Sequence, residues 1–476
     1  MLVAGGRLAA ALVALMSIRA VTTFLTPEQY GELALLIAVQ TFCGLFLINP
    51  IGQHINLHTH AWWGDGTLMA RLKSYRRYIF VVSFVGAAVV FFMGKQQTLE
   101  QILWSSAVMF TLVIVGTWNA TLIPMLNMLG FRSASVLWSI LTVMIGLACS
   151  ISFVIWLPSA TSWFSGQTIG MGIGALGAKY VLHKHALHTK LSKGRLSLID
   201  RRTVLSYCLP LALATGLMWL QLSGYRFLVE SYWGLAQLGF MVVGLQLTGQ
   251  ISALVESLVM QFFYPMFYRR VSAHEQVHEV ELAFSDLLNT LVPIYFVLTG
   301  LIIVSAPYLL KLLVASQFQD AIFFVILGAG IELCRVLGNI LSNAAQITRK
   351  TKSVVLPYAV GAIITFILIA LIGDRQQEMI WVGVALISGA IAMLLVMLKV
   401  MYRQVSFRLD VWRCLFGTLA MLTMIAVVDW MPKPDSWVVS IECLIVTATI
   451  ASIVVVALLW NNPAALRLLN VQLRKN

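Results

Sequence analysis

Four arginines lie inside, or at the edge of, long apolar segments of the chain: Arg7, Arg19, Arg226 and Arg335. Arginine keeps its charge at every cellular pH, and at the centre of a bilayer it costs about 2.5–3.5 kcal/mol or more. Its planar guanidinium donates paired hydrogen bonds to phosphate and carboxylate groups. We therefore interpret these four arginines as candidates for holding an anionic group in a wet cavity that is shielded from lipid.

Arg7 and Arg19 share the first apolar segment, and each also has a purely structural interpretation. Either side chain can snorkel to the headgroups at a membrane surface, and Arg19 can instead pair with a carboxylate of another helix. The two are twelve residues apart, so they differ by about 120° around a helix. Only a broad cavity wall would expose both.

Arg226 and Arg335 have acidic neighbours in sequence. Glu230 follows Arg226 by one helical turn, and Glu332 precedes Arg335 by three residues, so local ion pairs compete with ligand binding. Glu256 lies in an apolar segment of its own. A carboxylate within the membrane is a functional candidate. Glu256 and Glu332 are therefore candidates for binding a coupling proton or Na⁺. Each can instead form a structural ion pair.

The composition predicts a membrane protein. Of 476 residues, 60% are hydrophobic and 11% are charged, whereas soluble domains average about 25% charged residues. Runs of about 20 apolar residues recur along the whole chain, which is typical of an all-α polytopic membrane protein. We predict about 14 transmembrane helices, at 4–25, 32–53, 77–94, 102–126, 134–157, 162–182, 204–225, 235–260, 283–304, 321–345, 353–373, 379–400, 412–430 and 437–460.

The positive charges are unevenly distributed between the connections of these segments. With fourteen spans, 24 lysines and arginines fall on the side that holds both termini and 4 on the other side. Positive residues favour the cytoplasmic side, so we expect both termini to be cytoplasmic. This distribution also explains the net charge of +13 without a nucleic-acid partner.

An internal echo predicts two parallel lobes. The stretch FLTPEQYG at Phe24–Gly31 resembles FLVESYWG at Phe227–Gly234, and both join an outward span to an inward one. Repeats of the same orientation are typical of transporters that rock two halves about a central cavity. We predict an N-terminal six-helix lobe at 1–182, a basic linker at 183–203, a second six-helix lobe at 204–404, and two additional helices with a tail at 405–476.

Other clusters of reactive residues have simpler interpretations. The six cysteines are scattered through apolar runs, which favours small core residues over metal or disulfide roles. We place His54, His58 and His60, and likewise the histidines after 182, in solvated loops rather than at a metal site. The glycines around GMGIG in segment 162–182 favour close helix packing, because no strand precedes them. We therefore predict no metal, no cofactor and no catalytic residues.

Three stretches resemble one transporter family: RAVTTFLTPEQYGELALL from Arg19, YCLPLALATGLMWLQLSGYRFLVESYWGLAQLGFMVVGLQL from Tyr207, and APYLLKLLVASQFQDA from Ala306. They are similar to signatures of the polysaccharide transporters, which include O-antigen flippases, in the multidrug/oligosaccharidyl-lipid/polysaccharide exporter superfamily. Many relatives carry aspartate immediately before the arginine that corresponds to Arg226, where this chain has Tyr225. Arg226 is then left with Glu230 as its local partner.

The resemblance implies a flippase of the bacterial inner membrane. Its substrate would be an undecaprenyl-pyrophosphate-linked oligosaccharide, such as an O-antigen, capsule or exopolysaccharide repeat unit. An ion gradient would drive alternating access, and its partners would be membrane lipids and polysaccharide polymerase or assembly proteins. Three alternatives remain: a multidrug or cation antiporter of the same superfamily, a membrane enzyme such as a polymerase, and a non-transporting component of an assembly complex. The short outer connections disfavour the enzyme.

Overall fold

The computed structural model describes residues 2–94, 98–186, 201–273, 277–375, 378–460 and 462–473. Every regular element in these ranges is helical. The elements are α1 (Leu2–Phe24), α2 (Pro27–Thr41), η1 (Phe42–Ile48), α3 (Asn49–Gly64), α4 (Leu68–Ser74), α5 (Arg76–Met93), α6 (Leu99–Met128), α7 (Arg132–Trp156), α8 (Ala160–Ala186), α9 (Arg201–Trp219), η2 (Leu220–Gly224), α10 (Tyr225–Ala273), α11 (Val277–Leu313), η3 (Ser316–Ala321), α12 (Ile322–Ile347), η4 (Thr351–Val354), α13 (Val355–Asp374), α14 (Ile380–Tyr402), α15 (Val411–Ala426), η5 (Val428–Trp430), α16 (Trp437–Leu459) and α17 (Pro463–Leu473).

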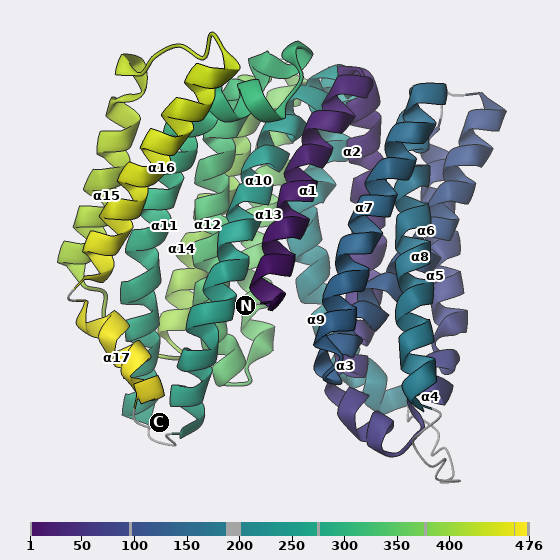
Figure 1. The fold of residues 1–476 in the computed structure, drawn as a ribbon, viewed down its shortest axis with the longest axis horizontal. Coiled ribbons are helices and arrows are strands. Elements are labelled where there is room, and N and C mark those ends of the chain that lie inside the picture. Colours follow the sequence, from purple (N-terminus) through teal and green to yellow (C-terminus); the bar gives the residue numbers. More distant parts are fainter. Residues whose placement is uncertain are drawn as a thin grey trace. The chain divides into compact units, whose positions relative to one another are not determined.

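The chain forms two compact units, Met1–Gly239 and Phe240–Asn476. Within each unit the long helices run side by side (Figure 1). The first unit therefore contains α9 and the first part of α10, which the sequence assigned to the second lobe. The six-helix lobes at 1–182 and 204–404, with the linker at 183–203, stay a prediction.

The helices have the length and apolar character of membrane spans. In the described part of the chain, 11 helical segments meet this criterion. One of them, Val204–Val271, contains two of the predicted spans, so the eleven segments cover twelve of the fourteen. The other two predicted spans coincide with α1 and α8. The prediction of an all-α polytopic membrane protein is confirmed.

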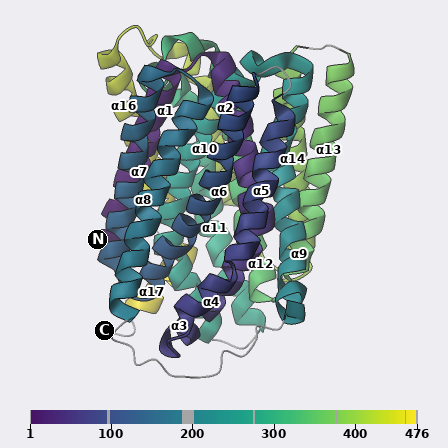
Figure 2. The same ribbon diagram turned by 90° about the vertical axis from the view of Figure 1, so that its right-hand side faces the viewer.

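Glycine packing explains how α7 and α8 meet in the first unit. A Cβ at Gly166 would collide with the backbone at Ser150, and one at Gly170 would collide with the backbone at Gly146. The two helices therefore touch backbone to backbone, as small residues allow in membranes. Figure 2 shows α7 and α8 adjacent along their length. The close packing predicted for the glycine-rich segment is confirmed.

Gly234 turns the chain between two spans inside the element labelled α10. Its φ of 80° and ψ of 174° belong to a conformation that only glycine adopts readily. The start of α2 lies directly against this turn, because a Cβ at Gly31 would meet the backbone of Leu235. The two echo stretches of the sequence, which end at Gly31 and Gly234, are therefore brought together in space.

Two π-helical segments interrupt the first unit, η1 within the second predicted span and η2 at the end of the seventh. Such segments are rare and frequently occur at functional sites. They lie close together: Trp219, just before η2, donates from its indole nitrogen to the Ala38 carbonyl at 2.9 Å, and its ring lies 4.9 Å from that of Phe42 in η1. The second predicted span ends at residue 53, just after Pro50. The helix instead widens before this proline and continues to Gly64.

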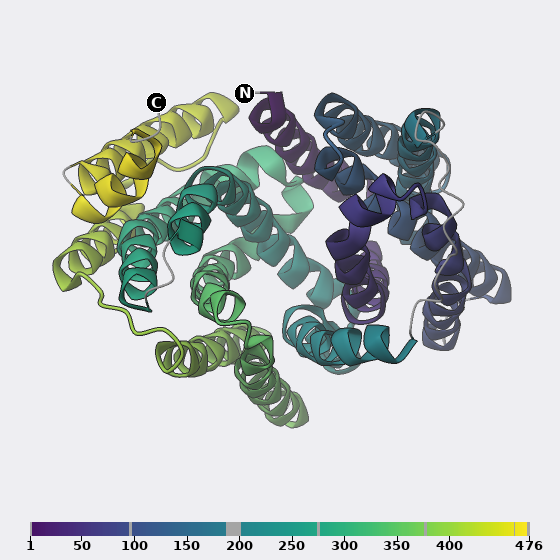
Figure 3. The ribbon, with the colours of Figure 1, turned by 90° about the horizontal axis from the view of Figure 1, so that it is seen from below.

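Helix α11 is the centre of the second unit. It contacts α12, α15, α16 and α17, and Figure 3 shows α15 and α16 beside it, viewed along the helices. Gly300 and Gly417 permit this contact, since a Cβ at Gly300 would press on Met421 of α15 and one at Gly417 on Pro293 of α11. The two helices after residue 405 are thus attached to the unit through α11.

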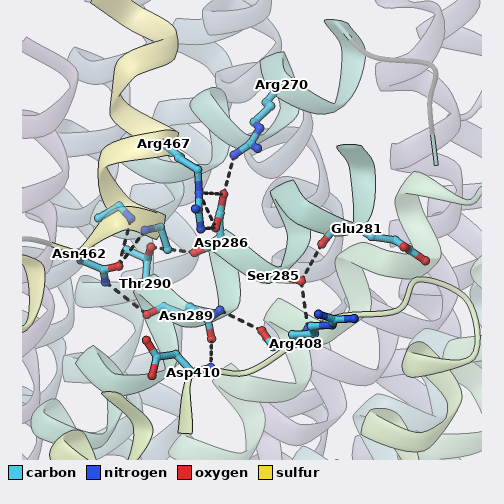
Figure 4. Close-up of polar contacts among 12 residues, drawn as sticks. Arg270, Glu281, Ser285, Asp286, Asn289, Thr290, Arg408, Asp410, Asn462 and Arg467 are labelled. Carbon is cyan, nitrogen blue, oxygen red and sulfur yellow. Dashed lines mark hydrogen bonds and ion pairs between the residues drawn. The ribbon is translucent and has the colours of Figure 1, made fainter. Parts of the chain in front are cut away.

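A buried ion-pair cluster ties α17 to α10 and α11 (Figure 4). The carboxylate of Asp286 is 2% exposed. It accepts a hydrogen bond from Nη1 of Arg270 at 2.6 Å and from Nε and Nη2 of Arg467 at 2.5–3.2 Å. Glu279 lies 3.7 Å from Arg270. The hydrogen bonds to Asp286 raise the pKa of the Arg467 guanidinium above its ordinary value, so this paired arginine remains charged.

Asn289, one turn beyond Asp286, holds the chain between α14 and α15. Its amide nitrogen donates to the Arg408 carbonyl at 2.9 Å, and its oxygen accepts from the Asp410 amide at 2.7 Å. Asp410 caps α15 by accepting from the backbone N–H of Arg413. These polar contacts fix the beginning of α15 on α11, next to the Asp286 cluster (Figure 4).

Candidate functional site

Arg19 and Arg7 both lie on α1. Arg19 is half-buried, and its carbonyl accepts hydrogen bonds from the hydroxyls of Thr22 and Thr23 at 3.2 and 2.7 Å. The side chain of Arg7 lies outside the described residues. The roles of both arginines in binding an anionic group therefore stay predictions.

Arg226 is the second residue of α10, which begins directly after the π-helical segment η2. Its Nη1 donates to the Ala34 carbonyl of α2 at 3.1 Å, while its Nε is buried without a hydrogen-bond partner. Among the described residues, no carboxylate lies within 4.0 Å of this guanidinium. The expected ion pair with Glu230 does not form, because the guanidinium is directed to α2 rather than along its own helix.

A pocket of about 380 Å³ with a mixed polar and apolar lining lies beside η1, within the first unit. Four amide side chains line it: Gln40, Asn49, Asn56 and Asn119. Two threonines and apolar residues of α6 and α8 complete the lining. Gly44 and Gly52 also line the pocket, and a Cβ at either position would meet no atom within 4 Å. The backbone around the π-helical segment thus leaves open space that a ligand can fill.

Asn119 shows that this pocket is organised. Its amide nitrogen donates to the hydroxyl of Thr142 and to the carbonyl of Met171, both at 3.1 Å. These bonds fix the amide plane and leave the side-chain oxygen as an acceptor. Amides offer both donors and acceptors but no charge, so the pocket suits neutral polar groups such as hydroxyls.

Arg335 lies at the centre of a charged triad in the second unit. Its Nε donates to Glu332 at 2.8 Å and its Nη2 to Glu256 of α10 at 3.0 Å. Asn339 donates to the other oxygen of Glu256 at 2.9 Å. The structure thus adds Glu256 to the pair of Glu332 and Arg335 that the sequence had suggested. With two carboxylates and one guanidinium, the triad carries a formal charge of −1.

The triad continues into a polar network between α10 and α12. The hydroxyl of Tyr268 donates to Asn343 at 2.8 Å, and the amide of Asn343 donates to the hydroxyl of Tyr264 at 3.2 Å. The carboxylates of Glu256 and Glu332 are 18% and 15% exposed. A partly wetted site with one excess negative charge can accept a proton or a monovalent cation. This supports the ion-coupling hypothesis, which stays a prediction.

Several functional assignments from the sequence need correction. His54, His58 and His60 lie on α3 and not in a loop, because the second span extends to Gly64. The rings of His54 and His58 are 4.4 Å apart, and the described residues contain no group of three potential metal ligands. Asp286 was not among the site residues predicted from the sequence. An acidic residue inside the apolar segment 283–304 was the signal that could have found it.

The comparisons with known proteins identify the fold. No family model and no curated protein match the sequence. Among solved structures, the chain is similar to the lipid II flippase MurJ in an inward closed conformation, with a TM-score of 0.64 and 12% identity over 94% of this chain and 96% of that chain. It is also similar to an inward-facing multidrug resistance MATE family transporter of the MOP superfamily, with a TM-score of 0.56 and 14% identity over 88% and 98%.

The chain has the MOP transporter fold. This is the superfamily fold that the resemblance of Arg19–Leu36 and the two later stretches implied, so that expectation is confirmed. One of the two similar proteins is a lipid II flippase and the other is a multidrug resistance transporter. The MOP fold places the Arg226 region and the amide pocket in one unit and the charged triad in the other.

Proposed function

We propose that this protein is a flippase that moves an undecaprenyl-pyrophosphate-linked oligosaccharide across the bacterial inner membrane by alternating access. The MOP fold supports transport, and the two kinds of polar site in the first unit suit the two parts of such a head group. Arg226 offers a fixed cation to the pyrophosphate. The amide pocket beside η1 offers donors and acceptors to sugar hydroxyls.

One observation supports this proposal most strongly. Arg226 has a buried Nε without a hydrogen-bond partner. Among the described residues, no carboxylate forms an ion pair with its guanidinium. A buried polar group without a partner costs about 1–3 kcal/mol, and more when it is charged. A diphosphate group would remove this cost, because guanidinium forms charge-assisted bonds with phosphate oxygens. Arg19 and Arg7 on α1 and Arg335 in the triad complete the proposed set of cations.

Ion coupling is proposed for the triad of Glu256, Glu332 and Arg335. Binding of one H⁺ or Na⁺ neutralises the excess negative charge between α10 and α12. A change of charge between two spanning helices alters their packing and can bias one conformation over another. In this scheme the ion gradient drives the cycle, and the lipid tail stays in the bilayer while the head group crosses.

The charge distribution supports a multi-pass inner-membrane protein with both termini in the cytoplasm. The proposed partners are the lipid-linked substrate, membrane lipids and the polymerase or assembly proteins that use the product. A second candidate is a multidrug or cation antiporter. The observation that favours it is the excess carboxylate in the triad, which a cationic drug could neutralise as well as a coupling ion.

Deleting the gene distinguishes these functions. If the protein is the proposed flippase, the deletion strain accumulates lipid-linked oligosaccharide that an impermeant glycosidase or lectin reaches only after the inner membrane is opened, and it loses surface polysaccharide. Complementation with flippases of known substrate then identifies the glycan. An antiporter predicts normal surface polysaccharide with increased drug sensitivity. That result would reject the flippase assignment.

A further inference from the structure

A second cavity, separate from the amide pocket, opens between α4, α5, α6 and α8 of the first unit. Its volume is about 320 Å³. Its walls are mostly apolar and include Trp118, Leu122 and Leu176. Figure 2 shows these four helices on the face turned to the viewer. None of the arginines and glutamates proposed to bind the substrate or the coupling ion lines this cavity.

Three cations surround this apolar cavity: Lys73, Arg76 and Lys179. All three side chains are exposed. No carboxylate is among the lining residues, and within the described residues none of the three forms an ion pair. Three like charges repel one another across a shared rim. The rim therefore favours an anionic group that lies among all three.

The position along the helices matches a membrane surface. Lys73 and Arg76 lie where the short helix α4 meets the start of α5, and Lys179 lies in the last turns of α8. Leu176, one turn before Lys179 on α8, is 67% exposed. The exposed face of α8 next to the cations is therefore apolar. An amphiphile with an anionic head and an acyl chain matches a basic rim that lies next to an apolar helix face.

We propose that this cavity is a binding site for an anionic phospholipid, with the lipid phosphate among Lys73, Arg76 and Lys179 and the upper acyl chain along the apolar wall. Basic pockets between spanning helices bind phospholipid head groups in this way. The proposal does not depend on what the protein transports. The surface formed by α4, α5, α6 and α8 would contact the anionic leaflet. This contact would anchor the first unit.

Lipid binding to the purified full-length protein tests this proposal. Native mass spectrometry in detergent compares phosphatidylglycerol with phosphatidylethanolamine of the same chains. We expect the wild type to prefer phosphatidylglycerol by about tenfold, and the triple variant Lys73→Gln, Arg76→Gln, Lys179→Gln to lose this preference. The matched control, Arg77→Gln, Arg132→Gln, Lys184→Gln, changes the total charge equally at exposed cations outside the cavity and should keep it.

Gly172→Leu tests the acyl-chain wall without changing charge. A Cβ at Gly172 makes only ordinary contact, 3.8 Å from the nearest Val115 carbon, so the larger side chain fills the cavity rather than disturbing the helix. We expect it to reduce phosphatidylglycerol binding while thermal unfolding stays unchanged. Equal loss in the two triple variants would overturn the proposal. Tighter binding of farnesyl pyrophosphate than of phosphatidylglycerol at this cavity would also overturn it, since the occupant would then be a polyprenyl pyrophosphate.

Discussion

We expect Arg226→Ala to abolish most transport without destabilising the protein. The guanidinium donates a hydrogen bond to the Ala34 carbonyl and keeps a buried Nε without a partner. Its removal therefore takes away little native stabilisation and relieves a cost of about 1–3 kcal/mol. If Arg226 binds the pyrophosphate, surface polysaccharide in the deletion strain falls at least about tenfold with the alanine variant, because a charge-assisted hydrogen bond contributes about 1.5–3 kcal/mol.

Two companion variants make this result specific. Arg226→Lys keeps the charge but loses the planar fork, so we expect partial activity. Arg77→Ala removes an exposed arginine at the start of α5 and should leave transport unchanged. Protein level and thermal unfolding are measured beside the polysaccharide. Normal polysaccharide with Arg226→Ala would remove Arg226 from the substrate site, and a lowered unfolding temperature would reassign it to a structural role.

Asp286→Asn produces the largest loss of stability. It leaves Arg270 and Arg467 facing each other at a site where the carboxylate was 2% exposed. Removing one partner of a buried ion pair costs about 3–5 kcal/mol. For a unit of this size, we expect the unfolding temperature in detergent to fall by about 5–10 °C or more.

Asp435→Asn is the matched control, because Asp435 is an exposed carboxylate of the same unit. Its unfolding temperature should equal that of the wild type. Arg467→Met is expected to be milder than Asp286→Asn, since Arg467 is 54% exposed and Arg270 still balances Asp286. If the Asp286→Asn variant unfolds at the same temperature as the Asp435→Asn variant, the cluster does not hold α17 on α10 and α11.

The helices could be predicted because lipid imposes a simple rule: a span of about 20 apolar residues with its backbone bonds satisfied internally. The chain reversal between the first two spans, in the stretch FLTPEQYG, and the glycine packing of segment 162–182 followed from local residue types. The π-helical segments did not, because the shift from an i→i+4 to an i→i+5 bond leaves no distinctive pattern in the letters of Phe42–Ile48. The second span was predicted to end at residue 53, whereas its helix continues to Gly64.

The contacts of the site residues also fall into two groups: those set by local spacing, which could be predicted, and those set by helix packing, which could not. The pairing of Glu332 with Arg335 was visible, because residues three apart meet on one helix face. Glu256 is 79 residues from Arg335 along the chain, and only the packing of α10 against α12 joins them. Local spacing gave the wrong partner for Arg226, since Glu230 is near in sequence while Ala34 of α2 is near in space.

The proposed function is the movement of a pyrophosphate-linked glycan across a membrane by this chain. Proteoliposomes holding the purified protein and a polyprenyl-pyrophosphate-linked oligosaccharide test it directly, with an external lectin or glycosidase reporting the glycan that reaches the outer leaflet. The account predicts transfer that an imposed H⁺ or Na⁺ gradient accelerates and that Arg226→Ala removes while Arg77→Ala does not. Transfer no faster than in protein-free liposomes, with the protein folded and correctly inserted, would contradict it.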